Sequence, residues 1–295
     1  MTTTPWIGGE ITPRALCVLA PNASPMTLEG TNTWILLEPG SRRAVVIDPG
    51  PDDPIHLGAV QRAVTEADAG VGLTLLTHGH FDHAGGARAF AAATGSDVRA
   101  GDPRHVLGSE GVVDGEVIEV GGLQIAVVAT PGHSADSMSF HLVADSALLT
   151  GDTILGRGTT MVAHPDGRLV DYLLSLRTLQ RLIDESPIDV VLPGHGPVVS
   201  SPADAVAYYV HHRYERLDQV RRALDAISSP ASASNVYPNN DEPIDGGLIK
   251  EIVALVYADV PRELWPAAEL SVAAQLEYLT AESGLAAPKS PERGQ

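Results

Sequence analysis

Residues 73–86 read LTLLTHGHFDHAGG and place three histidines and an aspartate within six positions, directly behind an apolar run. Core packing does not require such a concentration of nitrogen and oxygen donors. His78 and His80 are two residues apart, so they cannot share a helix face, but they can converge where a strand ends and the chain turns. Asp82 and His83 follow at the start of the expected next helix and can point back to the same place. Any one of these residues alone would be interpreted as a turn residue or a helix cap, whereas the combination predicts a metal site.

Three later segments supply further donors in the same kind of context. His133 lies in ATPGHSADS, Asp152 in LLTGDT and His195 in VVLPGHGP. Each follows an apolar strand-like run and has a glycine beside it, where the backbone can turn sharply and project a side chain from a sheet edge. Four loops thus share a metal-ligating side chain beside a glycine, directly after an apolar strand. Because ordinary turns do not require this pattern, it predicts one metal centre.

Composition limits the class of protein. The chain has 295 residues, of which 44% are hydrophobic, enough for one large domain or for a domain of about 200 residues with a smaller one. Acidic residues outnumber basic ones by 37 to 19, giving a net charge of −18. The negative net charge argues against stable binding of duplex nucleic acid, although it does not exclude a small local basic groove. Cys17 is the only cysteine, which excludes an internal disulfide and a thiolate zinc cluster.

The sequence contains neither of the two apolar patterns that direct a chain to a membrane. Its first residues lack a basic start followed by a long apolar core, and no stretch approaches 18 consecutive apolar residues. We therefore expect no signal peptide, no membrane span and a cytoplasmic location.

Up to about residue 200, short β-like runs alternate with glycine-rich turns and helical segments. Amphipathic spacing predicts helices over residues 53–68, 82–95 and about 169–184. Apolar runs bounded by turn residues predict strands over 31–38, 43–50, 71–78, 116–120, 123–133, 137–143, 147–152 and 189–196. This alternation favours an α/β sandwich, in which sheets pack together and helices lie outside.

After residue 200 the composition changes. Helices are expected over 201–224, 248–260 and 261–284, with a Pro/Ser/Asn-rich connection over 228–247. We therefore divide the chain into a first domain over residues 1–202, a helical domain over 203–288 and a disordered tail over 289–295.

The ordered motifs THGHFDH, TPGH, GD and PGHG, together with VVIDPG around Asp48, resemble those of the metallo-β-lactamase superfamily. The resemblance covers about residues 15–200. It implies a four-layer αβ/βα sandwich with a metal site at one edge of the two sheets, followed here by the smaller C-terminal helical domain.

The resemblance also implies which of these residues bind which of two metal ions. His78, His80 and His133 would hold a first ion, Asp82, His83 and His195 would hold a second, and Asp152 would bridge both. Asp48 would orient a ligand without touching metal. The remaining histidines have no partner at a ligand-like spacing and are not expected to bind metal: His56, His105, His141, His164, His211 and His212.

Imidazoles and carboxylates without sulfur suit zinc, with manganese or iron as alternatives. Relatives that use iron for redox work usually replace a histidine of the first motif by glutamate, so the retained His80 favours hydrolysis. Two zinc ions roughly 3.5–4 Å apart can hold a hydroxide and polarise the oxygen under attack. We therefore expect a zinc-dependent hydrolase with two ions, in which Asp82 and Asp152 are the catalytic residues.

The flanking segments, including GDTILGRGTT, are similar to the lactamase-beta-2-like branch, whose members carry a C-terminal winged-helix-like domain. Its animal representative is an endoribonuclease, which implies cleavage of a phosphodiester such as single-stranded RNA. In that reading Arg157, Thr159 and Thr160 contact phosphate oxygens. Two features oppose it: Ser137 stands where the branch usually has a histidine, and residues 203–295 hold 8 basic against 14 acidic side chains.

Other readings stay open. The main alternative is an acyl hydrolase that cleaves a small-molecule thioester, ester or lactone, with the helical domain walling an acyl pocket. A β-lactamase and a non-catalytic scaffold are the lesser alternatives. Apolar positions of the last two helices form either the core of the small domain or a homodimer seam. These positions are Leu248, Ile252, Leu255, Val256, Leu264 and Leu276.

Overall fold

The computed structural model describes residues 5–227 and 244–286. The predicted tail over 289–295 and residues 228–243 of the predicted connection lie outside the described residues.

Eleven strands form two sheets in the described part of the chain. The first sheet has the order β1-β2-β3-β4-β5-β6, antiparallel from β1 to β4 and parallel from β4 to β6. Its strands are β1 (Gly9–Thr12), β2 (Ala15–Leu19), β3 (Asn32–Leu36), β4 (Arg43–Ile47), β5 (Gly70–Leu75) and β6 (Val98–Arg99).

The second sheet has the order β11-β10-β9-β8-β7 and is antiparallel except between β10 and β11. Its strands are β7 (Val117–Val120), β8 (Leu123–Ala129), β9 (Met138–Leu142), β10 (Ala147–Gly151) and β11 (Val190–Pro193). The expected strands 31–38, 43–50, 71–78 and those after residue 116 are all present in shorter form, because most of the expected runs included turn residues at one or both ends of the strand.

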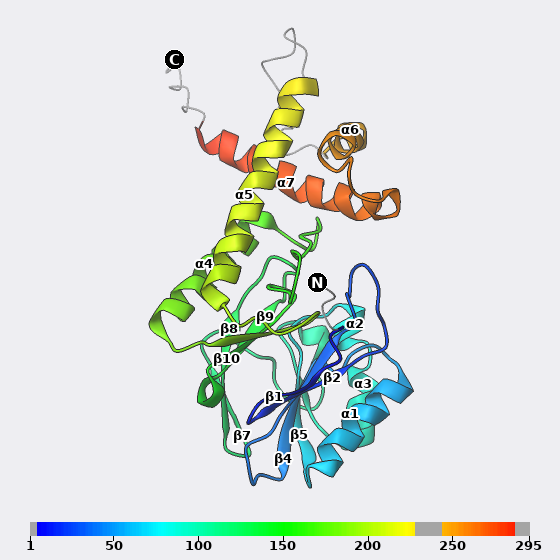
Figure 1. The fold of residues 1–295 in the computed structure, drawn as a ribbon, viewed down its shortest axis with the longest axis vertical. Coiled ribbons are helices and arrows are strands. Elements are labelled where there is room, and N and C mark those ends of the chain that lie inside the picture. The colour runs from blue at the N-terminus through cyan, green and yellow to red at the C-terminus, as the bar shows by residue number, and fades with distance from the viewer. Residues whose placement is uncertain (1–4, 228–243, 287–295) are drawn as a thin grey trace, which may run out of the picture.

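The two sheets pack face to face around a core to which both contribute. Leu36 and Ile47 of the first sheet and Ile125 and Phe140 of the second belong to one cluster of buried side chains. Helices cover the outer faces (Figure 1). The predicted four-layer αβ/βα sandwich is therefore confirmed, and its inner strands are apolar on both faces because both faces are covered.

The outer face of the first sheet carries α1 (Pro54–Glu66) and α3 (Ala87–Thr94). The short α2 (Phe81–Ala84) precedes α3, so the single helix expected over 82–95 is in fact two. The break lies at Gly85 and Gly86. A Cβ on Gly86 would lie 2.8 Å from the backbone oxygen of Pro51, so the chain passes too close to a neighbouring loop to continue one straight helix.

The outer face of the second sheet carries α4 (Leu169–Glu185). The C-terminal helices are α5 (Pro202–Ile227), α6 (Gly246–Val256) and α7 (Trp265–Ala286), with a short 3₁₀ turn, η3 (Arg262–Leu264), before α7. Of these helices, α5 and α7 pack on α4, and α6 packs on α5 and α7. Buried side chains of α4, α5, α6 and α7 belong to one cluster. The helical region and the sandwich therefore share a hydrophobic core.

The apolar positions considered for a homodimer seam divide between two environments. Ile252 and Leu276 are fully buried within this chain's own helices, as the small-domain reading expects. Leu255 is 57% exposed.

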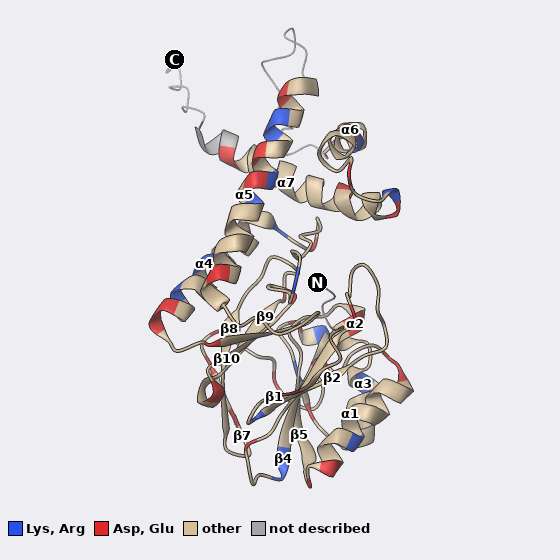
Figure 2. Ribbon diagram, viewed as in Figure 1, with Lys and Arg blue, Asp and Glu red and all other residues tan. Residues whose placement is uncertain are grey.

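Charge is mixed over the C-terminal helices. Figure 2 shows acidic and basic segments interspersed along α4 and α5. Among the described residues, none of the helices combines the length and apolar character that a membrane span needs.

Candidate metal centre

Four loops bring the predicted ligands to the same edge of the sandwich. The loop after β5 carries His78 and His80, and α2 at its end carries Asp82 and His83. The loops after β8, β10 and β11 carry the other three, which are His133, Asp152 and His195. The structure brings all seven side chains together, although more than a hundred residues separate the first from the last.

Within this cluster, two groups of three donors can be distinguished. In the first, His80 Nδ1 lies 3.0 Å from both His78 Nε2 and His133 Nε2. In the second, His195 Nε2 lies 3.2 Å from His83 Nε2. Asp82 Oδ2 lies 3.1 Å from His195 Nε2 and 3.3 Å from His83 Nε2. In each group the ligand atoms lie within 4.8 Å of one another, close enough to surround a single ion.

Asp152 lies between the two groups. Its Oδ2 is 3.7 Å from His133 Nε2 and 3.3 Å from His195 Nε2, while its Oδ1 is 3.4 Å from His83 Nε2. The buried Oδ1 has no hydrogen-bond partner. A carboxylate with a free buried oxygen between two sets of imidazoles is what the resemblance implies for a bridging ligand.

The outer ring nitrogens show that this cluster suits a cation. His83 Nδ1 lies 2.8 Å from Asp48 Oδ2, His133 Nδ1 lies 2.7 Å from the Met161 carbonyl and His195 Nδ1 lies 3.2 Å from the Gly30 carbonyl. Carboxylate and carbonyl oxygens only accept, so these Nδ1 atoms must carry protons. The Nε2 atoms that face the cluster are then available as metal ligands, the arrangement typical of histidine-bound metal.

Asp48 holds this arrangement from behind. It follows β4 with a left-handed backbone (φ 52°) and is 2% exposed. Its Oδ1 accepts from Thr77 N at 2.7 Å, and its Oδ2 accepts from Thr77 Oγ1 at 2.6 Å and from His83 Nδ1 at 2.8 Å. Although Asp48 also lies near enough to His78 and His83 to form a ligand group with them, both of its oxygens are already engaged. This geometry matches the orienting role implied by the resemblance.

Electrostatics within the cluster are strongly coupled. Burial raises the pKa of Asp152, but the His195 and His83 imidazoles lower it more, so the carboxyl is ionised. Burial lowers the pKa of His195, but Asp152 and Asp82 raise it to about 9. Burial, with the neighbouring His83, lowers the pKa of His78 well below its ordinary value. In the absence of metal, protons on the second group therefore balance the carboxylates, and a cation would replace them.

A cavity of about 330 Å³ opens beside the cluster, with His133 and Asp152 in its wall. The predicted substrate contacts Arg157, Thr159 and Thr160 also line it. Arg157 forms an ion pair with Glu29 at 2.6 Å. Thr160 is buried, and its Oγ1 lies 3.1 Å from His133 Nδ1, so it contacts a predicted ligand as well as the cavity.

The opposite wall of this cavity comes from the C-terminal region and a loop of the first sheet. Apolar contributions include Met26 and Leu28 from the loop before β3, Val260 and Leu264 from the segment that leads into α7, and Ala268 from α7 itself. Three arginines and His212 add polar groups, and Asp152 is the single carboxylate among the lining residues. A ligand in this cavity would contact the metal cluster at one side and apolar side chains at the other.

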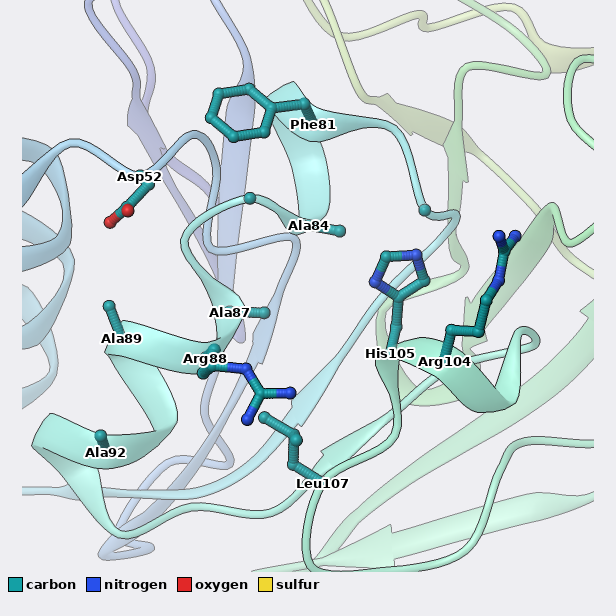
Figure 3. Close-up of a pocket in the computed structure, with 12 residues that line it drawn as sticks. Asp52, Phe81, Ala84, Ala87, Arg88, Ala89, Ala92, Arg104, His105 and Leu107 are labelled. Atoms are coloured by element: carbon teal, nitrogen blue, oxygen red, sulfur yellow. The ribbon is translucent and has the colours of Figure 1, made fainter.

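A second pocket, of about 590 Å³, is lined in part by α2 and α3 and is drawn in Figure 3. Phe81, Arg88 and His105 line it, and Phe81 is 70% exposed. None of the seven clustered side chains lines this pocket, so it is separate from the candidate centre.

The histidines that were not expected to bind metal belong to none of the three candidate ligand groups found among the described residues. They contact other groups. Buried His56 lies 2.9 Å from Thr33 Oγ1, for example, and exposed His211 pairs with Glu215 at 3.1 Å.

Two residues of the site were not singled out from the sequence. Thr77 links Asp48 to His78, whose Nδ1 is 3.0 Å from Thr77 Oγ1. Arg213 of α5 lines the cavity and is 5% exposed. A signal for Arg213 was present, because it lies at helical spacing with the apolar positions Val206, Tyr209, Leu217 and Val220. An arginine on the buried stripe of a helix is unusual, because arginine is almost never fully buried unless its charge is paired.

Comparison with known proteins decides the family. The sequence profile of the Metallo-beta-lactamase superfamily matches residues 26–195, more than half of the chain. The chain belongs to the metallo-beta-lactamase superfamily. Residues 249–286 match the Beta-lactamase associated winged helix domain, so the predicted type of C-terminal domain is confirmed as well. Membership of this hydrolase superfamily, together with the histidine and aspartate cluster, indicates a hydrolase with a divalent-metal site.

Individual relatives agree with this placement. A Drosophila melanogaster protein named Beta-lactamase-like protein 2 homolog is 29% identical, over 96% of this chain and 93% of its own length. An Atrochrysone carboxyl ACP thioesterase of Aspergillus fumigatus is 34% identical, over 85% of this chain and 76% of its own. A solved structure of a Beta-lactamase domain protein from Burkholderia ambifaria covers 96% of this chain with a TM-score of 0.73. At 20% identity, that likeness concerns the fold alone.

Proposed function

We propose that this metallo-beta-lactamase superfamily member is a zinc-dependent acyl hydrolase that cleaves small thioesters. The observation that carries the proposal is the cavity of about 330 Å³ that joins the metal cluster to a largely apolar wall. A cavity of this size, with apolar side chains at one side and polar groups beside the metal cluster, fits a small acyl chain whose carbonyl lies at His133 and Asp152. The Aspergillus fumigatus relative bears the name of a thioesterase, which favours the same class of bond.

We further propose two zinc ions, one held by His78, His80 and His133 and one by Asp82, His83 and His195, with Asp152 shared. Zinc bound there lowers the pKa of water and polarises a carbonyl oxygen. The buried imidazoles, each fixed by its outer nitrogen, keep the ligand atoms in place before substrate arrives.

The chain's own groups then orient the reactants. Burial raises the pKa of Asp82, but His83 and His195 lower it well below the usual range, so Asp82 stays a carboxylate. Thr31 Oγ1 donates a hydrogen bond to its Oδ2 at 3.3 Å and so orients the carboxylate that would hold the attacking water. Met26, Leu28 and Leu264 give the acyl side of the cavity an apolar lining.

Single-stranded RNA is the competing substrate, favoured by the three arginines of the same cavity. RNA sites usually offer aromatic rings on which bases stack. Among the lining residues Tyr257 is the only Phe, Tyr or Trp, and the Arg216 guanidinium lies over its ring at 4.8 Å. The net charge of −18 also opposes binding of a polyanion. We therefore place the thioester first.

A substrate panel tests the proposal. Zinc-loaded full-length protein would be offered acyl thioesters, single-stranded RNA, bis-p-nitrophenyl phosphate and nitrocefin. We expect thioesters to give the highest kcat/KM, and Asp152→Ala to lower it by at least about 100-fold, the scale on which a disturbed metal site loses activity. Asp225→Ala is the matched control, because Asp225 is exposed on α5. RNA or phosphodiester cleavage without thioester turnover would reject the proposal.

A further inference from the structure

Arg213 is a buried cation with an unused donor. It is 5% exposed, and its guanidinium carbon lies 5.0 Å from the centre of the Tyr172 ring. One terminal nitrogen, Nη2, donates to the carbonyl of Thr160. Its Nε is buried and has no hydrogen-bond partner. No carboxylate among the described residues forms an ion pair with it.

Such an arrangement is costly in a folded protein. Arginine stays charged in proteins, and a buried charge is normally paired with a counter-charge. The hydrogen bond from Nη2 to the Thr160 carbonyl gives Arg213 one structural role, which is to hold the loop after Asp152. This bond accounts neither for the unpaired Nε nor for the net positive charge of the guanidinium.

The surroundings of Arg213 are positive as well. Arg157 and Arg216 line the same cavity, against the single carboxylate of Asp152. Glu29 neutralises Arg157, whereas Arg216 lies over the Tyr257 ring and donates to Gln219 and to a backbone carbonyl. In a chain whose net charge is −18, this cavity therefore has the opposite sign to the molecule around it.

We infer that the acyl group of the substrate carries a carboxylate, and that Arg213 binds this carboxylate while the thioester lies at the metal cluster. The inference rests on the proposed thioesterase function and adds the substrate class, an acyl thioester with a second, anionic end. A guanidinium suits this task because its planar donors match a carboxylate in pairs.

Neighbouring groups support an anion at this place. His212 also lines the cavity, and its Nδ1 is buried without a hydrogen-bond partner. Burial, together with Arg213 and Arg216, lowers the pKa of His212 to about 4, so the ring is neutral at pH 7. It supplies a second polar group without a charge of its own. The apolar remainder of the wall favours an acyl carboxylate over the phosphate of a nucleic acid.

The test compares two substrates that differ at the far end of the acyl group, where one carries a carboxylate and the other its uncharged methyl ester. Zinc-loaded protein would be assayed with the glutaryl thioester of N-acetylcysteamine and with the methyl ester of the same glutaryl group. We expect wild type to favour the carboxylate by about 10- to 100-fold in kcat/KM, the range for hydrogen bonds to a charged group. In Arg213→Met this ratio falls to about one. Arg213→Lys, which keeps the charge but loses the planar fork, gives an intermediate ratio.

A purely structural role gives a different result. If Arg213 only anchors the Thr160 loop, both substrates lose activity by the same factor and the ratio is preserved in Arg213→Met, which overturns the inference. Arg222→Met, an exposed arginine on the same helix, is the matched control and keeps the wild-type ratio.

A binding measurement separates this inference from the proposed function. Calorimetry on zinc-loaded protein would compare glutarate with butyrate, which lacks the second carboxylate. We expect wild type to bind glutarate about 10- to 100-fold more tightly than butyrate. Arg213→Met should bind the two acids with equal affinity. If no thioester is cleaved but this difference persists, the proposed function fails and the anion site stands. Equal binding of both acids to wild type overturns the inference, whatever the enzyme cleaves.

Discussion

Replacement of Asp48 by asparagine changes the proton pattern of the centre while keeping the shape of the side chain. Asp48 accepts three hydrogen bonds, from Thr77 N, Thr77 Oγ1 and His83 Nδ1. In Asp48→Asn, the amide oxygen can still accept from Thr77 N. The amide nitrogen then faces Thr77 Oγ1 and His83 Nδ1, and it can only donate. His83 Nδ1 must become an acceptor, which moves the ring proton to Nε2, the atom that faces Asp82 and Asp152.

The size of the effect follows from this change of tautomer. A protonated Nε2 cannot bind metal, and loss of an outer partner of a metal-bound histidine typically lowers affinity 10- to 100-fold. This equals about 1.4–2.7 kcal/mol of binding free energy. We expect a loss in this range for the ion held by His83, and a smaller loss for the ion held by His78, which Asp48 reaches only through Thr77.

The assay is a zinc titration against a chelator of known affinity, for wild type and Asp48→Asn. Asp53→Asn is the control. Asp53 lies five residues away and caps α1 by accepting from Ile55 N and His56 N, and asparagine caps a helix equally well. Unchanged zinc affinity in Asp48→Asn, with the fold intact by circular dichroism, would refute the proposed role of this carboxylate.

Three further predictions concern the rest of the fold. Cys17 is 3% exposed and burial raises the pKa of its thiol, so Ellman's reagent at pH 8 should react only after unfolding; prompt reaction of native protein would contradict this. Tyr209→Phe removes the acceptor of Leu155 N at 2.8 Å and should lower the free energy of unfolding by about 1–3 kcal/mol in urea titrations, whereas Tyr208→Phe, 52% exposed, should change it little. Burial lowers the pKa of His56 below 6.5 in the folded protein. As the pH falls, His56 is therefore protonated in the unfolded chain before it is protonated in the folded chain. That contribution to stability is complete above about pH 6.5 and is lost as the pH falls from there through the folded pKa. His56→Gln should therefore lose less unfolding free energy than wild type between pH 7.5 and pH 5, and an equal loss would exclude His56 as the cause.

The sequence was most informative where chemistry and strand ends coincide. His78, His80, Asp82 and His83 could be placed because a donor-rich loop behind an apolar strand has no packing explanation. His133, Asp152 and His195 followed because each repeats the design of strand, glycine and donor. The assembly of these residues across two sheets came from the family resemblance, since no periodicity links positions so far apart.

Close approach between distant segments could not be predicted. The helix expected over 82–95 breaks at Gly85 and Gly86 because the loop around Pro51 passes beside it, and one helix's sequence does not report its neighbour. The connection from Asp48 through Thr77 to His78 depends on hydrogen-bond geometry that spacing does not encode.

The cavity was equally hidden, because it forms only when Met26 and Val260, more than 200 residues apart, face the same metal cluster. Arg213 differs from these features, because its position on the apolar stripe of α5 can be seen in the sequence alone, whereas its place in the wall of the cavity cannot.

Anomalous diffraction at the zinc absorption edge, on crystals of the zinc-loaded protein, tests the central claim most directly. We predict two peaks at the carboxyl ends of the strands, each about 2.0–2.2 Å from its nitrogen and oxygen ligands. One should lie among His78, His80 and His133, the other among Asp82, His83 and His195, with Asp152 touching both. Zinc bound elsewhere, with these side chains free of metal, would contradict the account.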